Sequence, residues 1–221
     1  MTDIYSLPWS HLADKEMSSA IYPNTISIIV TSYAIGIARG LTHLHSRDII
    51  HGDLTPKNVL IHIDEDGKIM PEISDFGRAK ILNVRGYTGS LNTTRRYTAP
   101  EVLFETHTLE SPTITIPPER ANEILSKESD VWSLGMVLLH VLSGVEPYHG
   151  LNENHIVLSL SRREEPNPEN HGDMINCPFR SRVWPLLRRC WEIDQHFTKR
   201  CSAKDCLATL EAPPKFLNYE I

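Results

Sequence analysis

Three short strings of residues in this 221-residue chain carry side chains that could do chemistry. In chain order they are IHGDLTPKNVL at 50–60, DFG at 75–77 and APE at 99–101. Their carboxylate and amide oxygens are groups that can accept a proton or bind a hard divalent cation. One string alone would fit a solvated Asp or an Asn in a turn. Three strings in a fixed order, with regular elements between them, form a much more specific pattern.

Regular elements are predicted around these strings. Apolar residues recur at helical spacing from Thr25 to about Ser46 and predict a helix. Two β-branched runs, Asn58–Ile63 and Lys68–Ile73, are joined by an acidic turn ending in Asp-Gly, which predicts a β-hairpin. The segment Val131–Leu142 is apolar nearly all round, so we expect a central, buried helix there.

The rest of the chain completes a mainly helical α+β fold. Further helices are predicted over Asn154–Arg162, Arg182–Glu192 and Ala203–Leu210. Residues 77–129 are predicted to be mostly irregular, and loops of such length in a compact domain are usually functional. We expect an irregular N-terminal segment (1–24), one domain (25–212) and a C-terminal tail (213–221).

Together, the strings and elements resemble the C-terminal, or large, lobe of a protein kinase. The resemblance extends from about Thr25 to Leu210. It includes Asp130–Gly135 at the start of the buried helix, Gly144–Tyr148 after it, and Arg189–Trp191 near the end. The Cys-Trp pair and the His-Gly-Asp form of the catalytic loop are most similar to the tyrosine-kinase-like group of Ser/Thr kinases. In such a lobe the hairpin carries the catalytic and metal loops.

The resemblance implies ATP- and Mg²⁺-dependent phosphoryl transfer to Ser/Thr hydroxyls of a protein substrate. Asp53 then matches the carboxylate that orients and deprotonates the substrate hydroxyl. Asn58 and Asp75 match the Mg²⁺ ligands that help to bind the nucleotide, and Leu60 matches the residue that packs under the adenine.

Other matching positions imply structural roles. They are His51, Phe76, Gly77, Thr94, Glu101, Asp130 and Arg200. His51 and Phe76 are expected to stack in the apolar spine that connects the two lobes, and Asp130 to hydrogen-bond the backbone of the catalytic loop. Glu101 is expected to pair with Arg200, and Thr94 to touch the catalytic carboxylate.

The chain departs from the family pattern at two positions of the catalytic loop. Gly52 stands where many kinases have an Arg that pairs with a phosphate, so ordering should not depend on loop phosphorylation. Thr55 stands where Ser/Thr kinases carry a catalytic Lys, and Lys57 lies two residues further on. A missing cation at a developing negative charge could cost several kcal/mol of activation barrier.

Two further departures concern whole segments. No Gly-rich phosphate loop and no Val-Ala-Ile-Lys strand precede the first helix, so we expect this chain to lack the small ATP-covering lobe. The segment Phe104–Arg120 is predicted to be an exposed insertion. These departures leave two alternatives open: a truncated pseudokinase that binds a protein partner as a scaffold, or an incomplete product with an exposed apolar patch.

Composition excludes several other classes of function. There are 22 basic and 28 acidic residues, a net charge of −6, which disfavours nucleic acid or an anionic membrane as the main partner. The longest apolar runs are too short to span a bilayer. The four cysteines, Cys177, Cys190, Cys201 and Cys206, form no Cys-x-x-Cys pair. We therefore expect reduced thiols in the cytoplasm in preference to a metal site or a disulfide.

Overall fold

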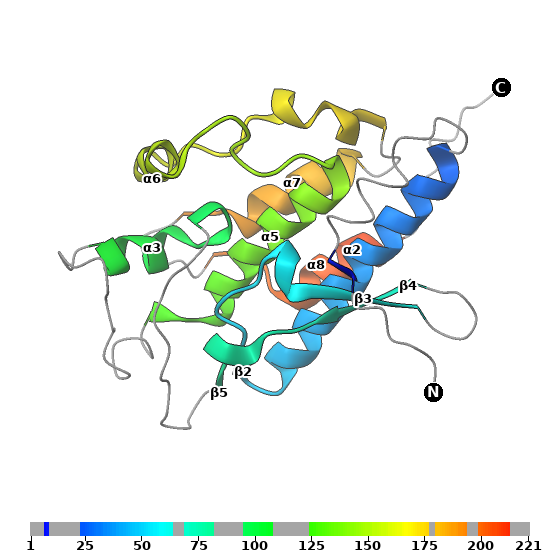
Figure 1. Ribbon diagram of the computed structural model, residues 1–221, viewed down its shortest axis with the longest axis horizontal. Coiled ribbons are helices and arrows are strands. Elements are labelled where there is room, and N and C mark those ends of the chain that lie inside the picture. Colours follow the sequence, from blue (N-terminus) through cyan, green and yellow to red (C-terminus); the bar gives the residue numbers. More distant parts are fainter. Residues whose placement is uncertain are drawn as a thin grey trace.

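The computed structural model describes residues 7–8, 23–63, 69–81, 95–107, 124–176, 180–193 and 199–212. This part of the chain is mainly helical, with two small antiparallel sheets (Figure 1). Its α-helices are α2 (Pro23–Ser46), α3 (Pro100–His107), α5 (Lys127–Ser143), α6 (Glu153–Ser161), α7 (Arg180–Cys190) and α8 (Ala203–Glu211). Among these described residues, no helix combines the length and the apolar character needed to cross a membrane.

Helix α5 forms the centre of the core, which confirms the predicted buried helix. Its residues from Ser129 to Ser143 are all buried except His140. The helix begins at a capping box, in which Ser126 accepts from the Ser129 backbone and Ser129 from the Ser126 backbone. It ends at Gly144, whose φ of 71° places it in the left-handed conformation that favours glycine. Helices α2 and α7 both pack against it.

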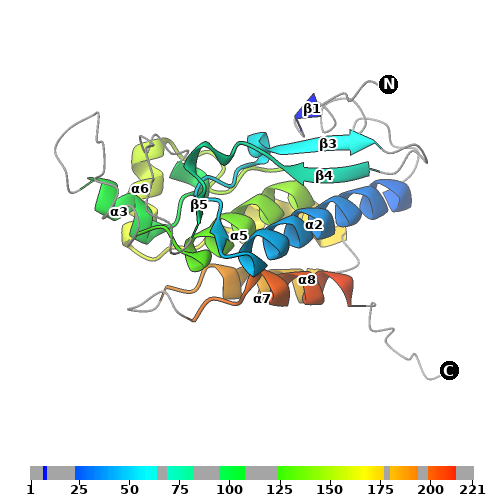
Figure 2. The ribbon, with the colours of Figure 1, turned by 90° about the horizontal axis from the view of Figure 1, so that it is seen from below.

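The predicted hairpin is confirmed as strands β3 (Val59–Ile63) and β4 (Ile69–Ile73), which pair antiparallel. The hairpin lies along α2, as Figure 2 shows. Gly36 of α2 permits this approach, because a Cβ there would collide with the ring of Pro71 in β4. The hairpin is therefore fixed against the long helix. Its open end, where Val59 pairs with Ile73, brings the residues just before β3 close to those just after β4.

Two short strand pairings were not predicted from the sequence. Strand β1 (Leu7–Pro8) pairs with β3, although the segment 1–24 was expected to be irregular. Helix α2 also begins within that segment, at Pro23. Strand β2 (Ile49–Ile50) pairs with β5 (Lys80–Ile81). This second sheet joins the residues before the catalytic loop to those after Asp-Phe-Gly.

The expectation of a mostly irregular segment over 77–129 is wrong in part. Besides β5, the segment contains the 3₁₀ turn η3 (Arg95–Tyr97) and α3. Helix α3 begins with Pro100 and Glu101, and a Pro and an acidic residue in the first turn are favourable helix-start signals. The predicted insertion over Phe104–Arg120 is also wrong at its start, since Phe104 is half-buried against the core. Residues 108–123 lie outside the described part.

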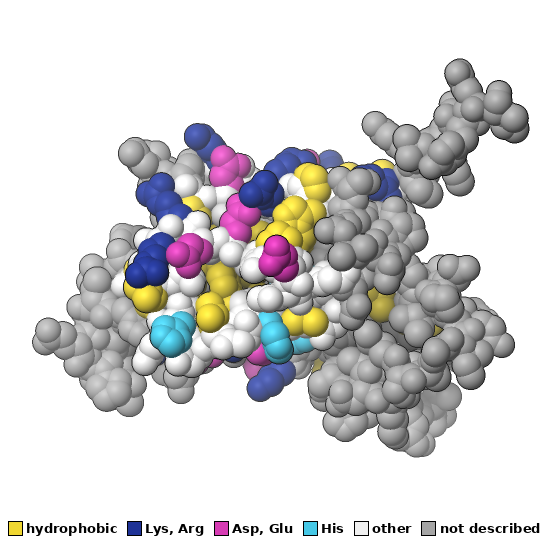
Figure 3. Space-filling view, turned by 90° about the horizontal axis from the view of Figure 1, so that it is seen from above, with side chains coloured by type: hydrophobic (Ala, Val, Ile, Leu, Met, Phe, Trp, Pro, Cys, Tyr) yellow, Lys and Arg dark blue, Asp and Glu magenta, His cyan; other side chains and the backbone are white. Residues whose placement is uncertain are grey.

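Helices α7 and α8 close the core on the side away from the hairpin (Figure 2). The predicted helices over 154–162, 182–192 and 203–210 correspond to α6, α7 and α8, each shifted by at most two residues at either end. On the face drawn in Figure 3, basic and acidic side chains lie intermixed over the described residues.

Candidate active site

The catalytic loop, residues 51–58, is held by a carboxylate of the buried helix. Asp130 Oδ2 accepts from the backbone N–H of His51, and Oδ1 accepts from that of Gly52, both at 2.8 Å. His45 Nε2 lies 2.9 Å from Oδ2, and Asp130 is 1% exposed. A buried carboxylate with three donors fixes the loop more firmly than neutral hydrogen bonds would.

The glycine at position 52 has a local physical reason. Its φ is 75°, and a Cβ there would lie 2.9 Å from the carbonyl oxygen of Arg78. A side chain at this position would be strained both in its backbone and against the neighbouring segment. The loop conformation therefore favours glycine where many kinases carry arginine.

Asp53 lies at the centre of the site, and Arg78 is its nearest cation in the described residues. Arg78 Nη1 is 3.1 Å from Asp53 Oδ1, and the two side chains are 15% and 21% exposed. Burial raises the pKa of Asp53, while Arg78 and then His51 lower it. The Asp75 carboxylate also raises this pKa, and a hydrogen bond from Asn58 lowers it. Each of these neighbouring side chains therefore influences the pKa of the Asp53 carboxyl.

Asn58 and Asp75 are brought together by the hairpin and by hydrogen bonds at its open end. Asn58 Nδ2 donates to the Asp53 carbonyl oxygen at 2.8 Å. The Asn58 carbonyl accepts from the backbone N–H of Ser74 at 2.8 Å and from its hydroxyl at 3.1 Å. Asp75 follows directly, in a left-handed conformation with φ of 60° and ψ of 72°, and its exposed carboxylate accepts from the Gly77 N–H at 3.2 Å. These hydrogen bonds bring the two residues together near Asp53, whose pKa the Asp75 carboxylate raises.

The His51 ring links the catalytic loop to Asp-Phe-Gly. His51 is fully buried, and its Nδ1 accepts from the Asp53 N–H at 3.2 Å. In this tautomer the Nε2 proton is donated to the Ser74 carbonyl oxygen at 3.0 Å. The Phe76 ring meets that of His51 edge-on, with centroids 5.5 Å apart, while Phe76 remains 49% exposed.

The other predicted residues of the loop lie in different environments. Thr55 is buried, Lys57 is exposed on the 3₁₀ turn η1 (Pro56–Asn58), and Leu60 is half-buried in β3. Leu60 lies between Pro8 and Glu72 in the sheet. Thr94 lies outside the described residues.

Glu101 and Arg200 join α3 to the turn before α8. Arg200 Nη1 and Nη2 donate to the two carboxylate oxygens of Glu101 at 2.6 and 2.9 Å. Arg200 also donates to the carbonyls of Glu128 and Glu192, and its guanidinium lies 5.0 Å from the centre of the Trp132 ring. This buried fork connects four separate segments of the chain.

Arg78 is the site residue that the sequence analysis missed. It ends the 3₁₀ turn η2 (Phe76–Arg78), for which Asp75 is the N-cap. Its place directly after Asp-Phe-Gly was the available signal, because a turn that starts at Asp75 keeps the next residues near the same site.

Comparison with known proteins agrees with this geometry. Residues 13–210 match the protein kinase domain family. The chain is 32% identical over 176 residues to mitogen-activated protein kinase kinase kinase 12 of Rattus norvegicus, covering 80% of this chain and 17% of that protein. It is 33% identical over 148 residues to serine/threonine-protein kinase ppk21 of Schizosaccharomyces pombe (63% and 23%). It is 28% identical over 187 residues to human 3-phosphoinositide-dependent protein kinase 1 (83% and 28%).

The chain thus spans less than a third of the length of each of these relatives. The shared region includes the ordered strings and the elements that position them, the long helix, the hairpin and the buried helix. The chain belongs to the protein kinase family, and its described part has the mainly helical fold of a kinase large lobe.

Proposed function

We propose that this domain catalyses ATP- and Mg²⁺-dependent phosphoryl transfer to Ser or Thr hydroxyls of a protein substrate. One observation carries the proposal: Asp53, Asn58 and Asp75, from two separate strings, converge at the open end of the β3–β4 hairpin. Phosphoryl transfer mainly requires that the protein position charged groups and provide an acceptor for the hydroxyl proton. These three side chains supply both.

Asp53 is suited to accept the proton of the substrate hydroxyl. Its burial raises its pKa, and a carboxylate with a raised pKa is a stronger base. Arg78 and the Asn58 hydrogen bond act in the opposite direction, and so favour the ionised form that a base requires. The side chain is 21% exposed, so it remains accessible from one side.

Asn58 and Asp75 would hold Mg²⁺. The donor set fits, because Mg²⁺ prefers oxygen ligands and takes only one or two from the protein. The Asn58 amide nitrogen is already donating to Asp53, which leaves the amide oxygen as the ligand atom, and the Asp75 carboxylate is exposed. When bound, Mg²⁺ neutralises charge on the phosphate oxygens.

Arg78 supplies the cation that the catalytic loop itself lacks near Asp53. Thr55 is buried and carries no charge, and Lys57 is exposed on η1. Arg78 has a guanidinium nitrogen 3.1 Å from the Asp53 carboxylate. We therefore assign to Arg78 the positioning of Asp53 and the stabilisation of negative charge beside it.

The class of substrate rests on the relatives. The fission-yeast relative is named a serine/threonine kinase, which favours Ser/Thr hydroxyls and a protein substrate here. Among the described residues, Cys190, Cys201 and Cys206 are free thiols, which favours action in a reducing compartment such as the cytoplasm. We propose that the folded domain covers about residues 25–212, and the family match over 13–210 supports most of this range.

The test uses the full-length protein as cells make it, with radiolabelled ATP·Mg and casein as a general Ser/Thr substrate. We expect transfer that Asp53→Asn abolishes without weakening ATP·Mg binding, and that Asp75→Asn abolishes together with that binding. Asp48→Asn, which changes an exposed carboxylate that pairs with Lys127, is the matched control. Transfer that survives Asp53→Asn would overturn the proposal.

A scaffold that binds a protein partner is the second candidate function. It is favoured by the burial of Thr55 at the position of the catalytic lysine. If the protein showed neither transfer nor thermal stabilisation by ATP·Mg, the scaffold function would replace phosphoryl transfer. Asp53 and Asp75 would then have structural roles only.

A further inference from the structure

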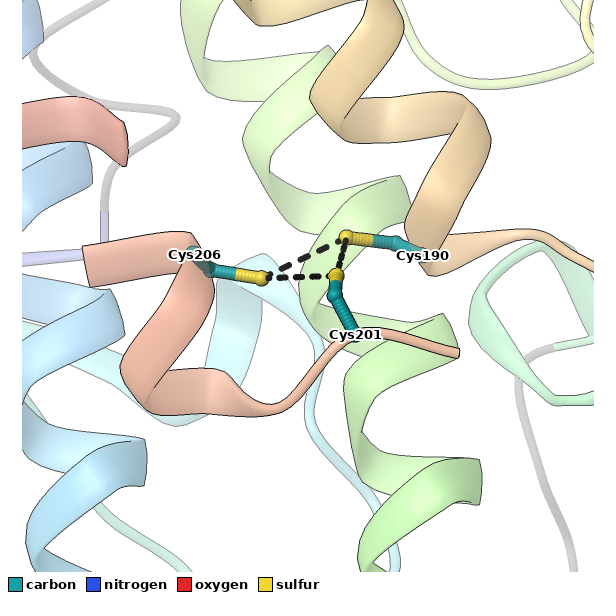
Figure 4. A group of neighbouring side chains, drawn as sticks. All are labelled: Cys190, Cys201 and Cys206. Atoms are coloured by element: carbon teal, nitrogen blue, oxygen red, sulfur yellow. Dashed lines mark hydrogen bonds between the residues drawn. The ribbon is translucent and has the colours of Figure 1, made fainter. Parts of the chain in front are cut away.

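Three cysteine side chains from separate segments meet inside the molecule, far from the catalytic loop in sequence. Cys190 ends α7, Cys201 lies in the turn before α8, and Cys206 lies in α8 itself. Figure 4 shows their sulfur atoms pointing toward one another. The Sγ–Sγ distances are 3.6 Å (190–201), 3.5 Å (190–206) and 3.4 Å (201–206). Cys190 and Cys206 are fully buried, and Cys201 is 7% exposed.

The meeting of the three cysteines could not be predicted from their spacing in the sequence. The three residues are separated by 11 and 5 positions, which matches no common metal-binding motif. The fold creates the cluster, because α7 and α8 pack together and Cys201 lies against the end of α7. The Cys201 N–H donates to the Arg189 carbonyl at 3.3 Å, which fixes that turn against the end of α7.

The geometry of the triangle suits a tetrahedral metal ion. Three sulfurs 3.4–3.6 Å apart lie on a circle of radius about 2.0 Å, slightly less than the zinc–thiolate bond of about 2.3 Å. An ion bonded equally to all three would therefore sit about 1.1 Å out of their plane. No backbone movement is required, and a fourth position remains on the open side of the ion.

We propose that Cys190, Cys201 and Cys206 form a binding site for a thiophilic d¹⁰ cation, represented by Zn²⁺. The three sulfurs bind as thiolates, and their protons are released to solvent as the ion enters. A water molecule or an external thiolate completes the coordination. The site is independent of the proposed phosphoryl transfer, since none of its ligands touches Asp53, Asn58 or Asp75 in the described structure.

The surroundings support such a site. Ser202 and Asp205 form a capping box that fixes the first turn of α8, from which Cys206 projects. That helix start favours negative charge, and an ion with three thiolates carries a net charge of −1. Gly135 of α5 provides the space, because a Cβ there would lie 2.7 Å from Cys190 Cβ.

The ion also has an entry path and a structural consequence. Cys201 borders a surface pocket that is lined further by Thr42, Lys127 and Lys204. Arg200, the partner of Glu101, directly precedes Cys201. A bound ion would therefore join α7 and α8 and hold the turn that carries the buried ion pair.

The test measures zinc binding by the intact chain, reduced and freed of metal with a chelator. We expect one equivalent of Zn²⁺ by elemental analysis, and a rise of several degrees in Tm, since an ion that binds the native state stabilises it. Replacement by Co²⁺ should give a thiolate-to-cobalt charge-transfer band. Cys201→Ala should weaken Zn²⁺ binding at least tenfold and remove that band, whereas Ser161→Ala, on the exposed surface of α6, should change neither.

A second measurement uses the unmodified chain, so it does not depend on whether a variant folds. Zn²⁺ should protect Cys190, Cys201 and Cys206 of the unmodified chain from alkylation by N-ethylmaleimide, as read by peptide mass. Substoichiometric zinc without such protection would overturn the proposal. A cobalt spectrum that is unchanged in Cys201→Ala would also overturn it. So would an intact mass two hydrogens lower in a chain that binds no metal, because that mass identifies a disulfide.

Discussion

Arg78 and Asp53 form a largely buried ion pair, 3.1 Å between Nη1 and Oδ1, in which the arginine follows Asp-Phe-Gly and the aspartate lies in the catalytic loop. The pair joins two segments separated by the whole β3–β4 hairpin. It also favours the ionised form of Asp53, since Arg78 is the largest influence that lowers the pKa of this carboxyl, against the greater effect of burial, which raises it.

Arg78→Ala is expected to raise the pKa of Asp53 further, because the removed cation stabilises the ionised form. Carbon-detected NMR titration of the aspartate carboxyls would measure it. A double-mutant cycle with Asp53→Asn should give a coupling of about 1 kcal/mol in the free energy of unfolding. If the proposed phosphoryl transfer holds, kcat of the full-length protein should fall about tenfold or more. An unchanged Asp53 titration would contradict the prediction.

Asp130→Asn is expected to destabilise the fold by about 2–3 kcal/mol, because the charged acceptor of three hydrogen bonds is lost. Urea unfolding measures this free energy, and hydrogen exchange should show faster exchange at the amides of His51 and Gly52. Asp48→Asn is the control: Asp48 is exposed, has a φ of 56° that asparagine tolerates, and pairs only with the partly exposed Lys127 among the described residues. Equal unfolding curves for the two variants would contradict the proposed stabilisation of the catalytic loop by Asp130.

The long elements of the fold were predictable because their periodicity is strong. Helix α2 has a continuous buried stripe that includes Ala34, Ile37 and Leu41, and α5 is buried on nearly every side. Such patterns follow from the local sequence alone. Helix α3 was missed because it has only eight residues, in a segment rich in Thr, Arg and Pro, where no periodicity can develop. Tertiary packing, with Val102 and Leu103 buried, stabilises it instead.

The candidate site likewise contains some residues that the sequence predicts and others that only the folded structure reveals. Asp53, Asn58 and Asp75 were found because they occur in ordered strings. Arg78 was missed, since its contact with Asp53 depends on how the turn η2 faces the catalytic loop. The meeting of the cysteines depends on the packing of α7 against α8, which no spacing in the chain encodes.

Arg200→Lys is expected to cost about 2–4 kcal/mol of unfolding free energy, because lysine cannot reproduce the two-pronged contact with Glu101. The Arg200 side chain is fully buried, so the lost contacts cannot be replaced by water. Arg39→Lys is the matched control, since Arg39 and Glu211 form a pair that is 59% and 43% exposed. That change should cost less than about 0.5 kcal/mol. Similar losses in both variants, measured by urea unfolding, would contradict the importance of the buried fork.

His171 provides a test by pH. It is 2% exposed, its Nδ1 lies 2.9 Å from Ser143 Oγ, and burial, with smaller effects of His140 and His149, lowers its pKa to about 4. The unfolded chain takes up this proton near pH 6.5, whereas the folded chain does not until about pH 4. The stability due to neutral His171 is therefore present above about pH 6.5 and is lost as the pH falls toward 4.

His171→Gln removes this titration. The unfolding free energy of the unmodified chain minus that of the variant should decrease between pH 6.5 and pH 4, by at most about 3 kcal/mol. His155→Gln, on the exposed surface of α6, controls for the loss of an imidazole from the chain. Urea unfolding at half-unit pH steps would measure the difference. A difference that stays constant over this range would show that His171 takes up its proton equally well in the folded and unfolded chain, contrary to what its burial requires.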